Sequence, residues 1–151
     1  MIPKNRAKLA ARVGSAAQAA LADKGYVSSI DVFLGIGWLD AGAVERWRRG
    51  QIGYLERVVQ ANLSRISEAM KLFRAWAAGQ GLYASATAYV ARRPGRPSLR
   101  FSRSGNPHIE AAYRTHWVSP KLQEKKRERL AEQASRAPGA VSSDALEGLS
   151  R

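Results

Sequence analysis

A stripe of apolar side chains at helical spacing constrains this fold more than any other feature of the sequence. Within residues 54–78 its members follow one another at steps of four, seven, four, three and four: Leu55, Val59, Ile66, Met70, Phe73 and Ala77. Such spacing is typical of an amphipathic helix that covers a core. We therefore expect one long helix from about Tyr54 to Ala78, with Asn62 as a hydrogen-bonded core residue that interrupts the stripe.

Shorter helices are expected before and after this one. Capping residues, proline starts and glycine stops predict them at about 4–22, 29–35, 40–49, 107–116 and 120–134. The predicted fold is mainly α, a multi-helix single domain over residues 26–134. A basic N-terminal helix or arm (residues 1–25) precedes it, and a disordered C-terminal tail (residues 135–151) follows it.

One small antiparallel β-hairpin is expected at about 86–102, with Pro94 and Gly95 at its turn. Five arginines with no acid between them lie on or beside it: Arg92, Arg93, Arg96, Arg100 and Arg103. Residues 92–129 carry eleven basic and three acidic residues, and this segment therefore holds most of the chain's net charge of +13. Because the charge is concentrated, it favours a binding face for a polyanion, of which nucleic acid is the commonest.

Aromatic residues alternate with these arginines. Tyr89 and Phe101 lie on the arginine-bearing strands, an arrangement used for phosphate neutralisation combined with base stacking. The alternative is that both rings pack the hairpin onto the helices. Two short helices, then a long helix and a basic hairpin, also resemble a helix-turn-helix followed by a wing, which would bring three more arginines to the duplex: Arg46, Arg48 and Arg49.

Two blocks of the chain carry a family resemblance. The first joins Gly35-Ile-Gly-Trp-Leu39 to Trp47-Arg-x-Gly50 and Asn62-Leu-Ser-Arg-Ile66, and the second runs from Leu99-Arg-Phe-Ser to Tyr113-Arg-Thr-His-Trp-Val-Ser-Pro120. Over about residues 26–130 they resemble the N-terminal region of an uncharacterised family of bacterial proteins of unknown function. Longer members continue into paired Cys-x-x-Cys motifs, which are absent here because the chain has no cysteine. The resemblance implies a bacterial, cytoplasmic protein, in a short or truncated form, and supplies no catalytic residue.

Other chemistry finds little support in the sequence. Without cysteine there are no disulfides, thiolate zinc sites or cysteine nucleophiles. His108 and His116 are eight residues apart, not the four typical of helical metal ligands, and structural roles are expected for both. We expect no catalytic residue, no metal, no cofactor and no membrane span. Residues 1–22, which are alanine-rich and basic, are also compatible with an organellar presequence.

Two functions fit these observations. The first is a small, non-catalytic nucleic-acid-binding module that contacts phosphates through the arginine-rich hairpin, with DNA and RNA left open. The second is a non-enzymatic adaptor that docks an acidic protein or a ribonucleoprotein partner through the same basic face.

Overall fold

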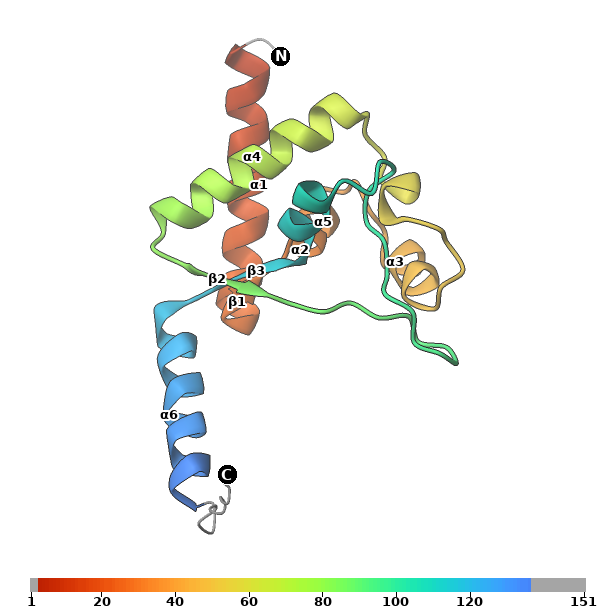
Figure 1. Ribbon diagram of the computed structural model, residues 1–151. Helices are drawn as coiled ribbons and strands as arrows, with labels where there is room; N and C mark the ends of the chain where they lie inside the picture. Colours follow the sequence, from red (N-terminus) through yellow and green to blue (C-terminus); the bar gives the residue numbers. More distant parts are fainter. Residues whose placement is uncertain (1–2, 137–151) are drawn as a thin grey trace. The chain divides into compact units, whose positions relative to one another are not determined.

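The structure is a computed structural model that describes residues 3–136, which form two compact units. The first unit ends at Ser119, and the second begins at Pro120. In the first unit the elements, in chain order, are α1 (Pro3–Lys24), β1 (Tyr26–Val27), α2 (Ser29–Gly35), α3 (Ala41–Arg48), the 3-10 helix η1 (Leu55–Val58), α4 (Leu63–Gly79), β2 (Tyr83–Ala86), α5 (Pro107–Arg114) and β3 (Thr115–Val118). The mainly α fold class is confirmed (Figure 1).

The core forms where α1 packs against α2 and α4. Leu9, Val13 and Ala17 are buried on one face of α1, at the four-residue steps of a helical stripe. An ion pair between Arg6 and Glu68 (2.8 Å) joins α1 to α4 at the surface. The helix predicted near the N-terminus is present as α1, and it supplies part of the core of the first unit.

The long helix begins later than its apolar stripe predicts. Asn62 is the N-cap of α4, and its side-chain oxygen accepts a hydrogen bond from the backbone N–H of Arg65 (2.9 Å). The expectation of a core Asn62 is wrong, since the residue is exposed. Leu55 and Val59 are buried as the stripe predicts, but Leu55 lies on η1 and Val59 is the residue that follows it. A short polar side chain that bonds its own backbone favours a helix start over a helix interior.

A three-stranded antiparallel sheet, absent from the sequence predictions, lies beside these helices in the order β1-β3-β2. Tyr26 and Tyr83 both pair with Val118, from opposite sides of β3. The helix expected to reach His116 ends at Arg114, and Thr115 begins β3. The run Thr-His-Trp-Val is rich in β-branched and aromatic residues, which suit a strand.

The hairpin expected at 86–102 is mostly a loop. Its pairing consists of one bridge between Val90 and Ser98, flanked by hydrogen bonds from Ala91 N–H to the Pro97 carbonyl and from Leu99 N–H to the Tyr89 carbonyl (both 2.8 Å). The turn at Pro94-Gly95 is confirmed: the Arg96 N–H donates to the Arg93 carbonyl (3.0 Å), with Gly95 and Arg96 at φ of +84° and +42°. We call residues 89–103 the arginine loop.

The second unit contains α6 (Pro120–Arg136), where a helix was expected over 120–134. Leu130 on this helix is exposed, in accord with the absence of an apolar stripe. Of the tail expected at 135–151, residues 135 and 136 lie in α6, and residues 137–151 lie outside the described part of the chain.

Candidate nucleic-acid interface

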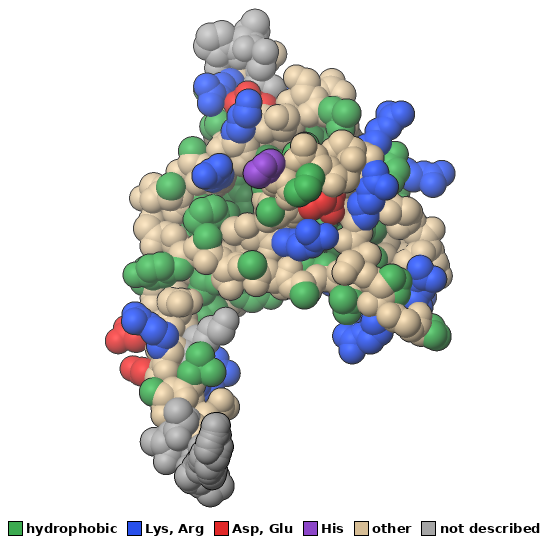
Figure 2. Space-filling view, viewed as in Figure 1, with side chains coloured by type: hydrophobic (Ala, Val, Ile, Leu, Met, Phe, Trp, Pro, Cys, Tyr) green, Lys and Arg blue, Asp and Glu red, His purple; other side chains and the backbone are tan. Residues whose placement is uncertain are grey.

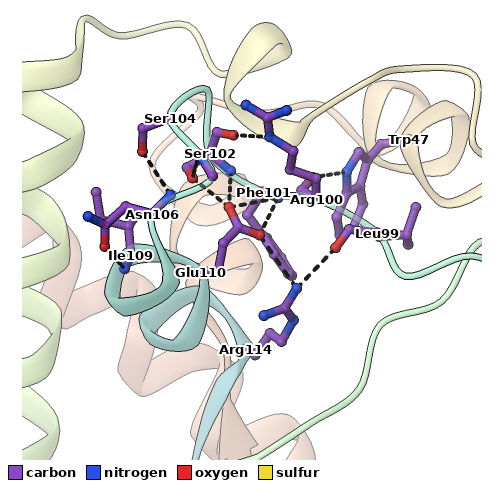
Figure 3. A network of polar contacts seen from close by, with 11 residues as sticks. Trp47, Leu99, Arg100, Phe101, Ser102, Ser104, Asn106, Ile109, Glu110 and Arg114 are labelled. Carbon is purple, nitrogen blue, oxygen red and sulfur yellow. Dashed lines mark hydrogen bonds and ion pairs between the residues drawn. The ribbon is translucent and has the colours of Figure 1, made fainter.

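A cluster of aromatic rings holds the arginine loop against the helices. Trp47 of α3 is fully buried, and its ring centroid lies 4.9 Å from that of Phe101 and 6.0 Å from that of Tyr89. Phe101 also stacks on Tyr113 of α5 (5.1 Å). Trp47 Nε1–H donates a hydrogen bond to the Arg100 carbonyl (2.8 Å, Figure 3). The loop is therefore anchored by burial at its aromatic positions.

This burial corrects one prediction about the site. Phe101 is 0% exposed and Tyr89 6% exposed, so neither ring offers a face on which a base could stack. Their interpretation as stacking residues is wrong, and the alternative in which they pack the loop onto the helices is confirmed. Successive side chains of an extended segment point to opposite faces, and here the aromatic residues lie on the buried face.

A buried carboxylate fixes the base of the loop. Glu110 on α5 accepts hydrogen bonds from the Phe101 N–H (3.0 Å), the Ser102 N–H (2.6 Å) and the Ser102 hydroxyl (2.5 Å). Arg114, one turn later, lies 3.5 Å from Glu110 and donates to the Leu99 carbonyl (3.4 Å, Figure 3). Sequence reasoning missed Glu110, whose only signal was an acid in the first turn of a helix followed by an arginine four residues later.

A second carboxylate, Glu56 on η1, supports the same segment. It accepts from the Arg103 N–H (2.9 Å) and from the Tyr113 hydroxyl (2.7 Å). Burial, together with this bond to the Glu56 carboxylate, raises the pKa of the Tyr113 phenol far above its usual range. Tyr113 therefore remains a neutral hydrogen-bond donor throughout the pH range of ordinary biochemical experiments.

The other end of the loop meets the C-terminal end of α3. The Arg92 N–H donates to the Arg48 carbonyl (2.8 Å), and the Arg92 and Arg49 side chains share one carboxylate, Glu45 (3.2 and 3.0 Å). A Cβ atom at Gly50 would lie 2.5 Å from Arg93 Nε, so glycine leaves the space that Arg93 occupies. The contacts thus place Arg48 and Arg49 beside the turn of the arginine loop.

The predicted arginines divide into those with structural contacts and those that face solvent. The Arg48 guanidinium lies over the rings of Tyr89 (5.2 Å) and Trp47 (5.9 Å). That of Arg100 donates to the carbonyls of Ser102 (2.8 Å) and Arg103. Within the described residues, four predicted arginines are exposed and have neither a side-chain hydrogen bond nor an ion pair: Arg46, Arg93, Arg96 and Arg103.

These side chains do not form one continuous stripe. Arg92, Arg93 and Arg96 surround the turn beside α3, whereas Arg100 and Arg103 lie at the base of the loop beside η1. Arg46 lines a hollow between α3 and η1 together with Arg57. Figure 2 shows Lys and Arg side chains gathered on the side of the molecule that carries α3 and the arginine loop. Arg49, Arg92 and Arg93 come together at the junction of α3 with the loop turn.

His116 contacts the same aromatic cluster from β3. Its Nε2 lies 2.6 Å from the Tyr89 hydroxyl, and its ring stacks on Tyr26 (5.0 Å). Burial lowers the pKa of the His116 imidazole from its ordinary value of 6.5, with Lys24 and Arg48 adding to that effect and Asp31 opposing it. Burial also raises the pKa of Tyr89. His116 is therefore a neutral, hydrogen-bonded structural residue near pH 7.

We expect the free energy of unfolding to fall as the pH is lowered from about 7.5 to 5.5. The unfolded chain then binds a proton at His116 that the folded protein resists, which destabilises the fold. Urea denaturation of the wild type and of His116→Gln, whose amide oxygen can still accept from Tyr89, would measure this. The acid-dependent loss should shrink in the variant, and identical pH profiles would contradict the assignment.

Neither a metal site nor a membrane helix is found in the described residues. Between residues 3 and 136, no three His, Asp or Glu side chains lie together as metal ligands would. No helix in that range is long and apolar enough to cross a membrane. Comparison of the chain with protein-family models, curated proteins and solved structures finds no match. The geometry of the arginine loop therefore carries the functional argument.

Proposed function

We propose that this chain is a small, non-catalytic nucleic-acid-binding module whose arginine loop contacts phosphates, in the bacterial cytoplasm that the family resemblance implies. The observation that carries the proposal is the junction of α3 with the loop turn. There Glu45 pairs with both Arg49 and Arg92, whereas Arg93, which packs over Gly50, and Arg96 in the turn form no ion pair within the described residues. Four guanidinium groups against one carboxylate leave a strong local excess of positive charge.

The support beneath these arginines favours binding to a polyanion. The Arg48 carbonyl, the buried ring of Trp47 and the Glu110 carboxylate hold the loop backbone at three separate points. A preformed support reduces the entropy that binding would otherwise cost. Guanidinium groups bind phosphate oxygens in pairs, a geometry that lysine cannot match. The loop therefore offers several phosphate-binding groups at fixed places.

The proposed contact residues are fewer than the arginines that the sequence singled out. Arg49, Arg92, Arg93 and Arg96 would contact phosphates, with Arg46 and Arg103 at the edges of the surface. Arg48 and Arg100 would position the loop through their contacts with rings and carbonyls. DNA and RNA both present the phosphate chemistry that this surface fits.

Replacing Arg92, Arg93 and Arg96 with glutamine should weaken nucleic-acid binding and reduce its dependence on salt. Each arginine that neutralises a duplex phosphate releases about 0.9 of a condensed cation, so the loss of three contacts should flatten the log–log salt slope by about 2.7. Fluorescence anisotropy titrations with duplex DNA, single-stranded DNA and structured RNA at several salt concentrations would measure it. Sequence preference should change little, because phosphate contacts position a protein without reading bases.

A matched control removes the same charge elsewhere. Lys4, Lys8 and Arg74 are exposed on α1 and α4, and the variant with glutamine at these three positions should keep a slope closer to that of the wild type. Equal slopes for the two triple variants would show that bulk charge, and not the arginine loop, drives binding. A wild-type protein that binds none of the three probes at low salt would reject the proposal and leave the adaptor function to be tested with acidic proteins.

A further inference from the structure

A second surface, away from the junction of α3 with the loop turn, has the form of a groove between α4 and α5. It encloses about 700 Å³. Its apolar lining comes from one face of α4 and the facing side of α5: Leu63, Ile66, Met70, Ile109, Ala112 and Tyr113. We call this surface the α4–α5 groove. Figure 2 shows the face on which α4 and α5 lie, with hydrophobic side chains over these helices and Lys and Arg side chains around them.

The edges of the α4–α5 groove expose large apolar side chains. Leu63 is 56% exposed and Ile109 is 42% exposed, among the few large hydrophobic residues of the described chain that face water to this extent. Leu63 also begins an α4 face that continues through Ile66, Met70 and Arg74, a rise of about 16 Å along the helix. A contiguous apolar patch of this kind on a soluble domain marks an interaction site.

The charge around the α4–α5 groove has one sign. Lys71, Arg74 and Arg103 line it, and none of the three side chains forms an ion pair within the described residues. Glu56 is the one carboxylate among the described lining residues, and it is already bound to the Tyr113 hydroxyl and the Arg103 N–H. The rim is therefore complementary to an acidic ligand with an apolar face.

We propose that the α4–α5 groove binds an acidic amphipathic helix of a partner protein. A groove about 16 Å long between two helices accommodates about three turns of a third, whose apolar residues would fill the floor at helical spacing. Its acidic residues would face Lys71, Arg74 and Arg103. The exposed side chains of Leu63 and Ile109 favour a macromolecular partner, because a small molecule in the floor would leave both in contact with water.

A capped 14-residue peptide with leucines on one helical face and glutamates elsewhere is the probe. Isothermal titration calorimetry with the full chain should give a Kd of about 100 µM or tighter. A peptide with the same leucines and with lysine in place of glutamate should bind at least tenfold more weakly, because it meets like charges at the rim (about 1.4 kcal/mol). A third peptide, with the leucines spread around the helix, should also lose binding.

Variants of the protein test the location. Lys71→Glu combined with Arg74→Glu should weaken binding of the acidic peptide by about fivefold or more and strengthen binding of the lysine peptide. Ile109→Ser should weaken binding of both peptides by about fivefold, because it removes an apolar contact. Lys4→Glu combined with Lys8→Glu, with the same charge change on α1, should leave the acidic peptide unaffected. Thermal melts should show that every variant is folded.

Several results would overturn the proposal. They are no binding of the acidic peptide at about 1 mM, equal binding of the lysine peptide, or equal affinity for wild type and the α4 double variant. Laurate binding without peptide binding would make the occupant a small amphiphile. A wild-type dimer in sedimentation analysis that Ile109→Ser dissociates would make it a second copy of this chain. The arginine-loop variants leave the floor of the α4–α5 groove intact, and the peptide titrations contain no nucleic acid. A failure of peptide binding and a failure of nucleic-acid binding can therefore be told apart.

Discussion

Trp47→Ala is expected to reduce the free energy of unfolding by about 3–5 kcal/mol. The ring is 0% exposed and contacts both Tyr89 and Phe101, so its removal leaves a cavity where α3 meets the arginine loop. It also removes the hydrogen bond that Nε1 donates to the Arg100 carbonyl. Urea denaturation followed by circular dichroism would measure the change.

Trp47→Phe separates the two parts of this effect. It keeps an aromatic ring in the cluster but leaves the Arg100 carbonyl without its donor, and we expect it to cost about 1–3 kcal/mol. If Trp47→Ala costs less than about 1 kcal/mol, the ring does not carry the packing described here. In that case α3 would hold the arginine loop through the Arg48 carbonyl and guanidinium and through the Glu45–Arg92 ion pair.

Local signals in the sequence predicted the helices well. Asp40 caps α3 by accepting from the Ala43 N–H, and Ser28 caps α2 by accepting from the Asp31 N–H, and both bonds span only three residues. Asn62 carries the same kind of signal, but the apolar stripe that continues on both sides of it suggested an unbroken helix. The structure shows that a cap decides where a helix begins even when buried residues precede it.

The sheet and the site depend on contacts between distant parts of the chain. Tyr26 pairs with Val118 across most of the first unit, and the Arg92 N–H bonds the carbonyl of Arg48. No short-range pattern encodes such a pair. The sequence located the arginines and the turn at Pro94-Gly95, but strand alternation alone left open whether Tyr89 and Phe101 faced inward. Only the position of Trp47 beside them decides that they do.

The two proposed surfaces meet at Arg103. Its backbone N–H is held by Glu56 at the base of the arginine loop, and its side chain lines the α4–α5 groove. Glu56 in turn accepts from Tyr113, which lies in the floor of that groove and stacks on Phe101 of the loop. A partner helix in the groove would therefore contact residues that also support the loop, which would give the two proposed binding events a physical route for coupling.

Glu110→Ala is expected to destabilise the protein by about 3 kcal/mol and to loosen the arginine loop. The substitution leaves the Phe101 N–H, the Ser102 N–H and the Ser102 hydroxyl without their acceptor in a buried place. Arg114 also loses its ion-pair partner. The free energy of unfolding would come from urea denaturation, and amide hydrogen exchange at Phe101 and Ser102 would report the loop directly.

Glu110→Gln is the matched control, because it keeps the size of the side chain and one acceptor oxygen. It should cost less, about 1–2 kcal/mol, and retain part of the amide protection. Glu110 is buried and is not among the proposed phosphate-contacting residues. If folded Glu110→Ala protein loses nucleic-acid binding, the loss would therefore arise from loop order. Unchanged exchange at both amides in the alanine variant would show that the aromatic cluster alone fixes the loop, and that the carboxylate is not needed for it.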